Sequence, residues 1–275
     1  LGYNTCRSQA KVLALVVEGV QQAKVSGNDL VDAVFNQTPF YAESGGQVAD
    51  IGRAFNDEME AVIEDVQKIG NLFVHKLRVL KGKISSGDLL RLEVDNSNRE
   101  GISANHSATH LMHQALKDVF GSHVNQRGSL NDAEKIRFDF SHDRPLSSKD
   151  IILVEKIVNE KILQNSIIST RLMDLNAAKK LGAQALFGEK YDDEVRVVLI
   201  GNGEERKSRI ENTNQYSMEL CGGTHVEQTG EIALFHILTE TGISAGVRRI
   251  EALTSTRAFE WYQDRSDTLG QITSQ

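Results

Sequence analysis

The sequence predicts an α+β protein with an antiparallel β-barrel over residues 1–95, followed by an α+β domain over residues 96–255. Up to residue 95 the chain alternates short apolar stretches with turn residues, which is typical of a small barrel of short strands. Beyond it, apolar residues first recur at helical spacing, and helix-like and strand-like segments then follow one another. Residues 256–275 are predicted to begin a C-terminal helix that leads to a region outside this chain.

Five apolar stretches predict the strands of the barrel. Turns that contain glycine, such as residues 45–46, 81–82 and 86–88, separate them and allow the chain to reverse direction. The stretches are residues 12–17, 33–35, 61–66, 72–80 and 89–94.

The second domain opens with a predicted helix between Asp95 and Phe120, whose apolar residues lie on one side. A second helix is predicted over residues 148–164, and its capping candidates are Ser147, Ser148 and Asp150. The remaining predicted elements are a short helix over residues 176–183 and strands over residues 135–140, 167–173, 195–200, 233–239 and 248–253.

The composition is that of an ordinary globular chain with an acidic excess. With 275 residues, of which 40% are hydrophobic, the chain can bury a core in each of two domains. The formal net charge of −7 argues against a broad surface that coats nucleic acid. No run approaches the roughly 18 apolar residues that span a bilayer, and the two cysteines suit a reducing compartment. We therefore expect a cytoplasmic protein without a membrane partner, and Leu1 in place of an initiating Met indicates a piece of a longer polypeptide.

Two short motifs predict a zinc site. His106 and His110 lie four residues apart in a predicted helix, so both imidazoles lie on one face. Cys221 and His225 have the same spacing across two glycines, which allow a tight loop. Each pair alone is weak evidence, because surface and capping histidines are common. Together the four predict one Zn²⁺ per chain, whereas the nearby His113 is expected to pack or to form hydrogen bonds.

Seven longer stretches match the sequence pattern of one known family. They are residues 37–47 (QTPFYAESGGQ), 105–113 (NHSATHLMH), 128–130 (GSL), 137–142 (RFDFSH), 185–191 (ALFGEKY), 219–225 (ELCGGTH) and 246–252 (GVRRIEA). With them, essentially the whole chain resembles the editing region of bacterial-type alanyl-tRNA synthetases and the free-standing proteins that hydrolyse misacylated alanine tRNA. The resemblance implies a translation-factor-like barrel followed by a zinc-containing editing domain. It also implies that the aminoacylation domain and most of the oligomerising C-terminal region are absent from this chain.

The resemblance implies a reaction and a partner. The chain is expected to hydrolyse the ester that joins mischarged serine or glycine to the 3′ end of tRNA(Ala). A bound Zn²⁺ lowers the pKa of its water toward ~7 or polarises an oxygen, but three imidazoles and one thiolate fill a tetrahedral shell, as in structural sites. Direct participation, through a fifth ligand or a loosely held side chain, and a purely organising role are both open.

Four residues of the first domain are expected to approach the substrate. Gly45 and Gly46 lack the side chains that would hold a ligand away from the backbone, and Gln47 lies beside them. The alternative for Gln47 is an exposed amide on a barrel turn. Thr38 is expected to offer its hydroxyl to the serine side chain, whereas alanine would leave this polar group unpaired.

In the second domain, Gln126 and Arg249 complete the expected catalytic set with Gln47 and Thr38. The resemblance implies that Gln126, which follows the histidine-bearing helix, orients water or substrate. Arg249 lies on a predicted strand, where one arginine of a doublet should face the cleft and could grip the terminal phosphate or ribose. A salt bridge with Glu251 or a neighbouring acid is the alternative.

Two other functions compete with hydrolysis. One is a tRNA-binding module with a purely structural zinc, catalytically inert without the absent parts. The metal motifs adjoin glycine-rich elements rather than a basic stripe, which favours the hydrolase. A zinc peptidase is disfavoured, because the chain has no H-E-x-x-H motif and no glutamate between His106 and His110.

Overall fold

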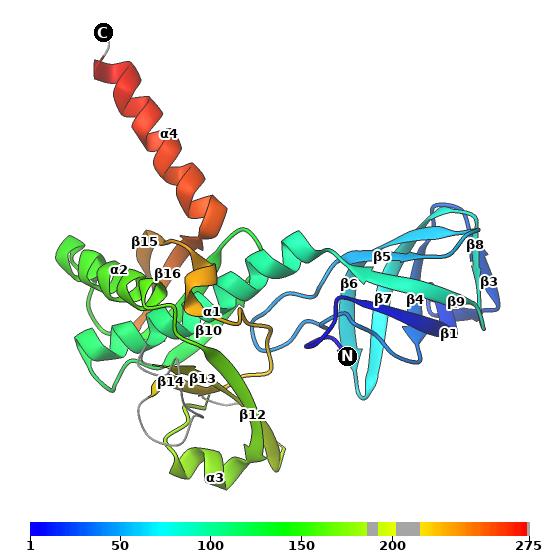
Figure 1. Cartoon of the computed structure of the whole chain (residues 1–275), viewed down its shortest axis with the longest axis horizontal. Helices are drawn as coiled ribbons and strands as arrows, with labels where there is room; N and C mark the ends of the chain where they lie inside the picture. The colour runs from blue at the N-terminus through cyan, green and yellow to red at the C-terminus, as the bar shows by residue number, and fades with distance from the viewer. Residues whose placement is uncertain (186–191, 202–214, 274–275) are drawn as a thin grey trace. The chain divides into compact units, whose positions relative to one another are not determined.

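The computed structural model describes residues 1–185, 192–201 and 215–273 (Figure 1). The chain divides into two compact units, Leu1–Glu100 and Gly101–Gln275. Helices and strands are mixed along the chain, which confirms the predicted α+β class.

The first unit contains a closed, six-stranded antiparallel β-barrel, as the sequence predicts. The barrel closes because β1 (Arg7–Val17) pairs with two strands, β4 (Leu30–Phe35) on one side and β9 (Leu89–Val94) on the other. The pairing of β1 with β9 runs from Arg7 opposite Glu93 to Lys11 opposite Leu89. In order around the barrel the strands are β1 (Arg7–Val17), β4 (Leu30–Phe35), β7 (Leu72–Lys81), β6 (Glu60–Ile69), β5 (Gly52–Phe55) and β9 (Leu89–Val94), while β2 (Val20–Gln22) pairs with β1 and β3 (Lys24–Ser26) pairs with β8 (Lys83–Ser85).

Alternating side chains fill the barrel. In β9, Leu90 and Leu92 are buried, whereas Leu89 before them and Arg91 between them are exposed. Burying an aliphatic side chain of this size contributes about 1.5–3 kcal/mol, so the inner row fixes which face of each strand points inward. The sequence does not predict β5, whose Gly52 is required because a Cβ there would collide with the carbonyl oxygen of Glu93.

The segment between β4 and β5 is held in place by a buried ion pair. The carboxylate of Asp50 accepts a hydrogen bond from the backbone amide of Tyr41 at 2.6 Å and binds Arg99, whose Nε lies 2.7 Å from Oδ1. Arg99 also donates to the carbonyls of Gly2 (2.7 Å) and Pro39 (3.1 Å). Removing one partner of such a buried pair typically costs about 3–5 kcal/mol, so the conformation of this segment depends on Asp50 and Arg99.

The second unit is built around α1 (Asn96–Phe120), which begins in the first unit. The sequence predicts one apolar side, but residues 102–113 are buried all round. The polar face is buried because its hydroxyls bond to the segment that follows β14 (Gln215–Leu220). Ser103 donates to the Thr224 hydroxyl at 2.9 Å, and Ser107 accepts from the backbone amide of Val226 at 3.2 Å.

Two antiparallel sheets accompany this helix. The sequence does not predict β10 or β14, because their residues are largely polar and they become strands by pairing with more apolar neighbours. The four-stranded sheet has the order β10 (Gln126–Asn131), β11 (Ile136–Ser141), β16 (Val247–Thr254) and β15 (Phe235–Ser244), and the three-stranded sheet has the order β12 (Ile168–Asp174), β13 (Glu194–Gly201) and β14.

Three other helices among the described residues lie close to their predicted positions, whereas one 3-10 turn is not predicted. The first, α2 (Ser148–Leu163), starts with a capping box in which the Ser147 hydroxyl accepts from the Asp150 amide at 3.2 Å and the Asp150 carboxylate accepts from the Ser147 amide at 2.9 Å. In the described residues no helix combines the length and the apolar character needed to cross a membrane. The remaining helices of the described residues are α3 (Leu175–Lys180), a 3-10 turn (Thr229–Ile232) and α4 (Ser255–Thr273). One of the family stretches, residues 185–191, lies outside the described residues except for its first residue.

Candidate metal centre

The structure brings together the four side chains that the sequence predicts as metal ligands, referred to below as the four-ligand set. His106 and His110 come from α1, and Cys221 and His225 come from the loop after β14. Their ligand atoms all lie within 4.8 Å of one another. Cys221 Sγ lies 3.3 Å from His106 Nε2 and 3.4 Å from His225 Nε2. In a tetrahedral zinc site with the usual bond lengths, sulfur and nitrogen ligands lie about 3.5 Å apart, so the set has room for one Zn²⁺.

The loop that presents Cys221 is fixed by Arg196 of β13. The Arg196 guanidinium donates to the carbonyls of Cys221 (3.0 Å) and Gly223 (2.7 Å), and its own carbonyl accepts from the Cys221 amide at 3.0 Å. The Gly223 amide points back to Sγ at 3.4 Å. Because α1 is a regular helix and this loop is bonded along its length, the ligands are positioned by the surrounding backbone.

Charges within the set suit a cation. Burial alone would raise the pKa of the Cys221 thiol, but the imidazoles of His106, His225 and His110 hold it well below its ordinary value. Burial lowers the pKa of His225 to about 3, and the nearby His106 adds to this shift while the Cys221 thiolate opposes it. The thiolate of Cys221 and the neutral imidazole of His225 are in the protonation states that zinc requires of its ligands. The anionic neighbours of His110 raise the pKa of that ring to about 10, so a metal ion bound there would displace its proton.

Glu219 contacts the four-ligand set through His110, and sequence reasoning misses it. Its buried carboxylate lies 2.9 Å from Nδ1 of His110 and 3.0 Å from Nδ1 of His113. Burial alone would raise the pKa of Glu219, but these two imidazoles hold it well below its ordinary value. A carboxylate on the second nitrogen of a metal-binding histidine fixes which nitrogen faces the metal. The available signal is an acidic residue two positions before Cys221, within the family stretch at residues 219–225.

The remaining imidazole nitrogens also fit a metal set. Nε2 of His110 is buried and has no hydrogen-bond partner. Nδ1 of His225 lies 3.2 Å from the hydroxyl oxygen of Ser107, and that hydroxyl donates its own proton to the Ser103 carbonyl at 2.7 Å. His225 must therefore donate from Nδ1, which leaves the lone pair of Nε2 directed to the set. His113 forms a hydrogen bond with Glu219, as expected, and is not part of the set.

Gln126 stands at the start of β10. Its side-chain amide donates to the Ser129 hydroxyl at 3.0 Å. The pairing of β10 with β11 is irregular between Gln126 and Gly128. In the described part of the chain no hydrogen bond joins Gln126 to the four-ligand set, and its role in orienting water or substrate stays a prediction.

Arg249 lies opposite Asp139 where β16 pairs with β11. The two side chains form a bidentate ion pair, with Nε 2.6 Å from Oδ1 and Nη2 2.8 Å from Oδ2. The side chain of Arg249 is 30% exposed. The neighbouring Arg248 pairs with Glu240. Arg249 therefore has an acidic neighbour across the sheet and an exposed part that faces solvent.

Thr38 belongs to the first unit and is bonded on two sides. Its hydroxyl oxygen lies 2.7 Å from Nε2 of the fully buried His75 and accepts from the Phe40 amide at 3.1 Å. Nδ1 of His75 faces the Ala33 carbonyl at 3.3 Å, so the ring proton lies on Nδ1 and Nε2 accepts from Thr38. Burial lowers the pKa of His75 to about 4. At neutral pH the Thr38 hydroxyl is thus a donor to His75 and retains one free lone pair.

Gly45 and Gly46 form a tight turn in the same unit. Both have a positive φ, +58° and +81°, which glycine adopts without strain. Ser44 and Gln47 exchange backbone hydrogen bonds across the turn at 3.0 and 3.2 Å. The Gln47 side chain is fully buried, in contrast to the exposed amide of the alternative interpretation. A Cβ on Gly45 would meet no neighbouring atom, so the backbone at this turn is open to a ligand.

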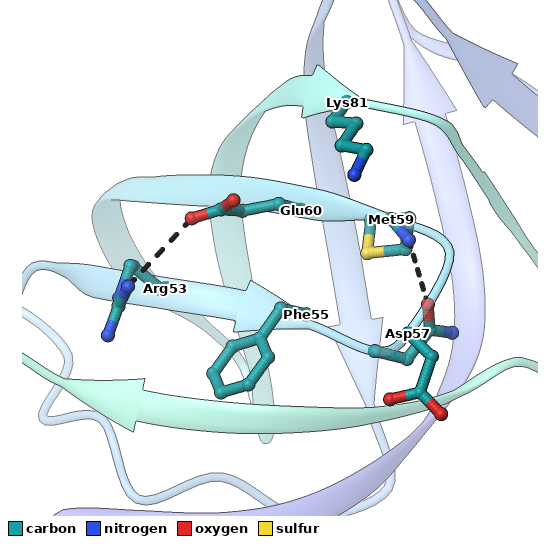
Figure 2. A pocket seen from close by; sticks show the side chains of 7 residues that line it. Arg53, Phe55, Asp57, Met59, Glu60 and Lys81 are labelled. Atoms are coloured by element: carbon teal, nitrogen blue, oxygen red, sulfur yellow. Dashed lines mark hydrogen bonds and ion pairs between the residues drawn. The ribbon is translucent and has the colours of Figure 1, made fainter.

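A separate pocket of about 170 Å³ lies on the barrel (Figure 2). None of the predicted site residues lines it. Arg53 and Glu60 face each other across it, with 3.9 Å between Nη1 and Oε1. Its lining residues are Arg53, Phe55, Asn56, Asp57, Met59, Glu60 and Lys81.

Two family models match parts of the chain. The one described as tRNA synthetases class II (A) matches residues 1–98, which contain the barrel. The one described as the threonyl and alanyl tRNA synthetase second additional domain matches residues 195–251, which contain Glu219, Cys221 and His225.

Curated relatives match the chain over its whole length. It is 48% identical over 279 residues to the alanine–tRNA ligase of Ruegeria pomeroyi, which covers 100% of this chain and 31% of the relative. The alanine–tRNA ligase of Dinoroseobacter shibae is 48% identical over 272 residues, covering 99% of the chain and 31% of the relative. That of Rhizobium johnstonii is 48% identical over 268 residues, covering 97% and 30%. The chain thus spans less than a third of the length of these relatives.

Proposed function

The chain belongs to the alanyl-tRNA synthetase family, and on this premise we propose that it carries the editing activity of such an enzyme. The proposed reaction is hydrolysis of the ester that joins serine or glycine to the 3′ end of tRNA(Ala). The observation that carries the proposal is the four-ligand set with its orienting carboxylate, Glu219, within the unit that matches the second additional domain.

In this proposal, His106, His110, Cys221 and His225 hold one Zn²⁺. A zinc ion held there would supply positive charge beside the ester, where it would either polarise an oxygen or keep the site in shape. The Glu219 carboxylate lies 2.9 Å from Nδ1 of His110, so Nε2 would be the atom left to bind the metal. Ser107 does the same for His225 through Nδ1.

Thr38 is proposed to recognise serine as a hydrogen-bond acceptor. Its own proton is directed to His75 and one lone pair receives the Phe40 amide, so one lone pair remains for a hydroxyl donor. The serine side chain of a mischarged tRNA can donate there, whereas alanine cannot. A polar group that loses its partner discriminates strongly between such substrates.

Gln126, Gln47 and Arg249 are proposed to position the reacting groups. The carbonyl oxygen of the Gln126 side chain has no hydrogen-bond partner among the described residues and can accept from a water molecule or from the ribose. Asp139 occupies two of the five N–H donors of Arg249, and the others can bind phosphate. The open backbone at Gly45, together with the adjacent Gly46 and Gln47, is proposed to accept the substrate.

The proposal is tested by incubating the chain with serine-, glycine- and alanine-charged tRNA(Ala) and determining its zinc content on the same sample. We expect ester loss from serine- and glycine-charged tRNA, little loss from alanine-charged tRNA, and one zinc in the four-ligand set. Saturable tRNA binding without ester loss would instead support the tRNA-binding module with a structural zinc.

A further inference from the structure

A second cluster of side chains that could hold a metal ion lies just beyond the C-terminal end of α1. His123 follows this helix, and His142 and Asp143 follow β11. One ligand atom from each of the three lies within 4.8 Å of the other two. His123 and Asp143 are exposed and His142 is buried, so the cluster opens to solvent on one side.

The backbone around this cluster is bonded in a way that holds the two histidines together. The Ser141 hydroxyl donates to the His123 carbonyl at 2.7 Å and accepts from the Asn125 amide at 2.9 Å. The His142 amide donates to the Gly246 carbonyl at 3.0 Å, in the turn between β15 and β16. Three separate segments of the second unit therefore meet at this point.

The two imidazoles face each other as ligands of one ion do. Nε2 of His123 lies 3.0 Å from Nδ1 of His142. Two imidazole nitrogens bound to one tetrahedral Zn²⁺ lie about 3.3 Å apart, so a shift of a few tenths of an ångström would admit the ion. Phe120 packs on the His142 ring, with 4.7 Å between centroids, and limits its movement.

The charges at the cluster also suit a cation. Burial, assisted by the neighbouring imidazole of His123, lowers the pKa of His142, so this ring is neutral at pH 7 as a metal ligand must be. The Asp143 carboxylate has no hydrogen bond or ion pair among the described residues and supplies a negative charge. Imidazole suits zinc, copper and nickel ions, and zinc also binds Asp carboxylates.

We propose that His123, His142 and Asp143 form a second, solvent-facing site for a divalent transition-metal ion such as Zn²⁺. The site is weaker than the four-ligand set. It has three protein ligands in place of four, and ligation at Nδ1 moves the ring proton of His142 to Nε2, which is buried without a hydrogen-bond partner. The site joins the loop after α1, the end of β11 and the turn that carries Gly246.

The test is the number of zinc ions per chain, measured by mass spectrometry after dialysis of the whole chain against zinc buffers of decreasing free concentration. The expected result is two ions per wild-type chain at the highest concentration, of which one is lost first as chelator is added. His123→Ala and Asp143→Asn are both exposed substitutions and are expected to bind one ion only. Asp267→Asn, an exposed carboxylate on α4, is the matched control and should keep two.

A second readout identifies the ligands without a substitution. Saturating zinc should shift the ring ¹⁵N resonances of His123 and His142 in the wild-type chain, in step with uptake of the weaker ion. The proposal is overturned if the wild-type chain never binds more than one zinc, or if His123→Ala and Asp143→Asn still bind two. Unchanged His123 and His142 resonances during uptake of the second ion would also overturn it.

Discussion

Two buried histidines, one in each unit, have pKa values that are shifted in opposite directions. Inside the barrel, burial lowers the pKa of His75 to about 4. In α1, burial alone would lower the pKa of His110 as well, but the charges of Glu219 and Cys221 raise it to about 10. The partners make the difference, because His75 meets a hydroxyl and a carbonyl, whereas His110 meets a carboxylate and a thiolate.

This difference separates two uses of a buried imidazole. Neutral, buried surroundings disfavour the charged form of the imidazole, so His75 serves as a fixed hydrogen-bond acceptor for Thr38. An anionic surrounding attracts positive charge, so the second unit can hold a metal ion where His110 otherwise keeps a proton.

The first prediction removes the thiolate. Cys221→Ala takes away one ligand and one of the two anions that face His110, so the four-ligand set should lose its zinc and deacylation of serine-charged tRNA(Ala) should be abolished. Zinc content and ester loss are measured on the same sample. Cys6→Ala, a substitution of the only other cysteine, is the control and should change neither. Full turnover by a Cys221→Ala chain that lacks zinc would refute the metal assignment.

The second prediction concerns the pH dependence of the barrel. Because the pKa of His75 is about 4 in the folded chain, against 6.5 for a free histidine side chain, the unfolded chain binds the proton more readily. Stability contributed by neutral His75 is complete above pH 6.5 and declines as the pH falls toward 4, by about 3 kcal/mol in total.

Hydrogen exchange of barrel amides between pH 7 and 4, with an NMR titration of the His75 ring, measures this loss. His75→Phe has no titrating group and should remove the part of the pH slope that His75 causes. A His75 ring that titrates near pH 6.5 in the folded chain would contradict the contrast between the two histidines.

The third prediction tests the orienting carboxylate. Glu219→Gln keeps the shape of the side chain but removes its charge, so the zinc affinity of the four-ligand set should fall by about 10–100-fold. Competition with a chelator gives the affinity. Glu251→Gln, which loses a partly exposed ion pair with Lys135, is the matched control and should leave the affinity unchanged. Equal affinities for the Glu219→Gln and wild-type chains would show that the carboxylate does not orient His110.

The smallest expected effect is that of Gln126→His. The substitution replaces the free carbonyl oxygen of the amide by a ring, which should slow deacylation by about ten-fold through poorer orientation of water or substrate. The zinc content should stay at the wild-type value, because Gln126 is outside the four-ligand set. Loss of zinc from this variant would show that the substitution acts through the metal site and not through the orientation of water or substrate.

Much of the fold follows from local patterns in the sequence. The barrel strands alternate between buried and exposed residues, and α2 carries its own capping box at Ser147 and Asp150. The strands β10 and β14 could not be predicted, because their largely polar residues adopt the extended form only through pairing with partners distant in sequence. The burial of the polar face of α1 likewise depends on a segment more than a hundred residues away, as in the bond between Ser107 and His225.

For the candidate site, the sequence predicts the metal ligands because their spacing forms recognisable motifs. The two i,i+4 pairs are visible as motifs, and the structure brings their ligand atoms within 4.8 Å. Glu219 has no spacing signal of its own, and its role depends on β14 lying against α1. The pairing of Arg249 with Asp139 depends on the register of β16 on β11, and the bond from Thr38 to His75 depends on how the loop after β4 returns to β7.

X-ray absorption at the zinc edge, on a chain loaded with a single equivalent of zinc, shows whether Cys221 and three histidines bind the ion. One sulfur at about 2.3 Å and three imidazole nitrogens at about 2.0–2.1 Å are the result predicted for the four-ligand set. A zinc environment of nitrogen and oxygen alone, without the sulfur of Cys221, would contradict it.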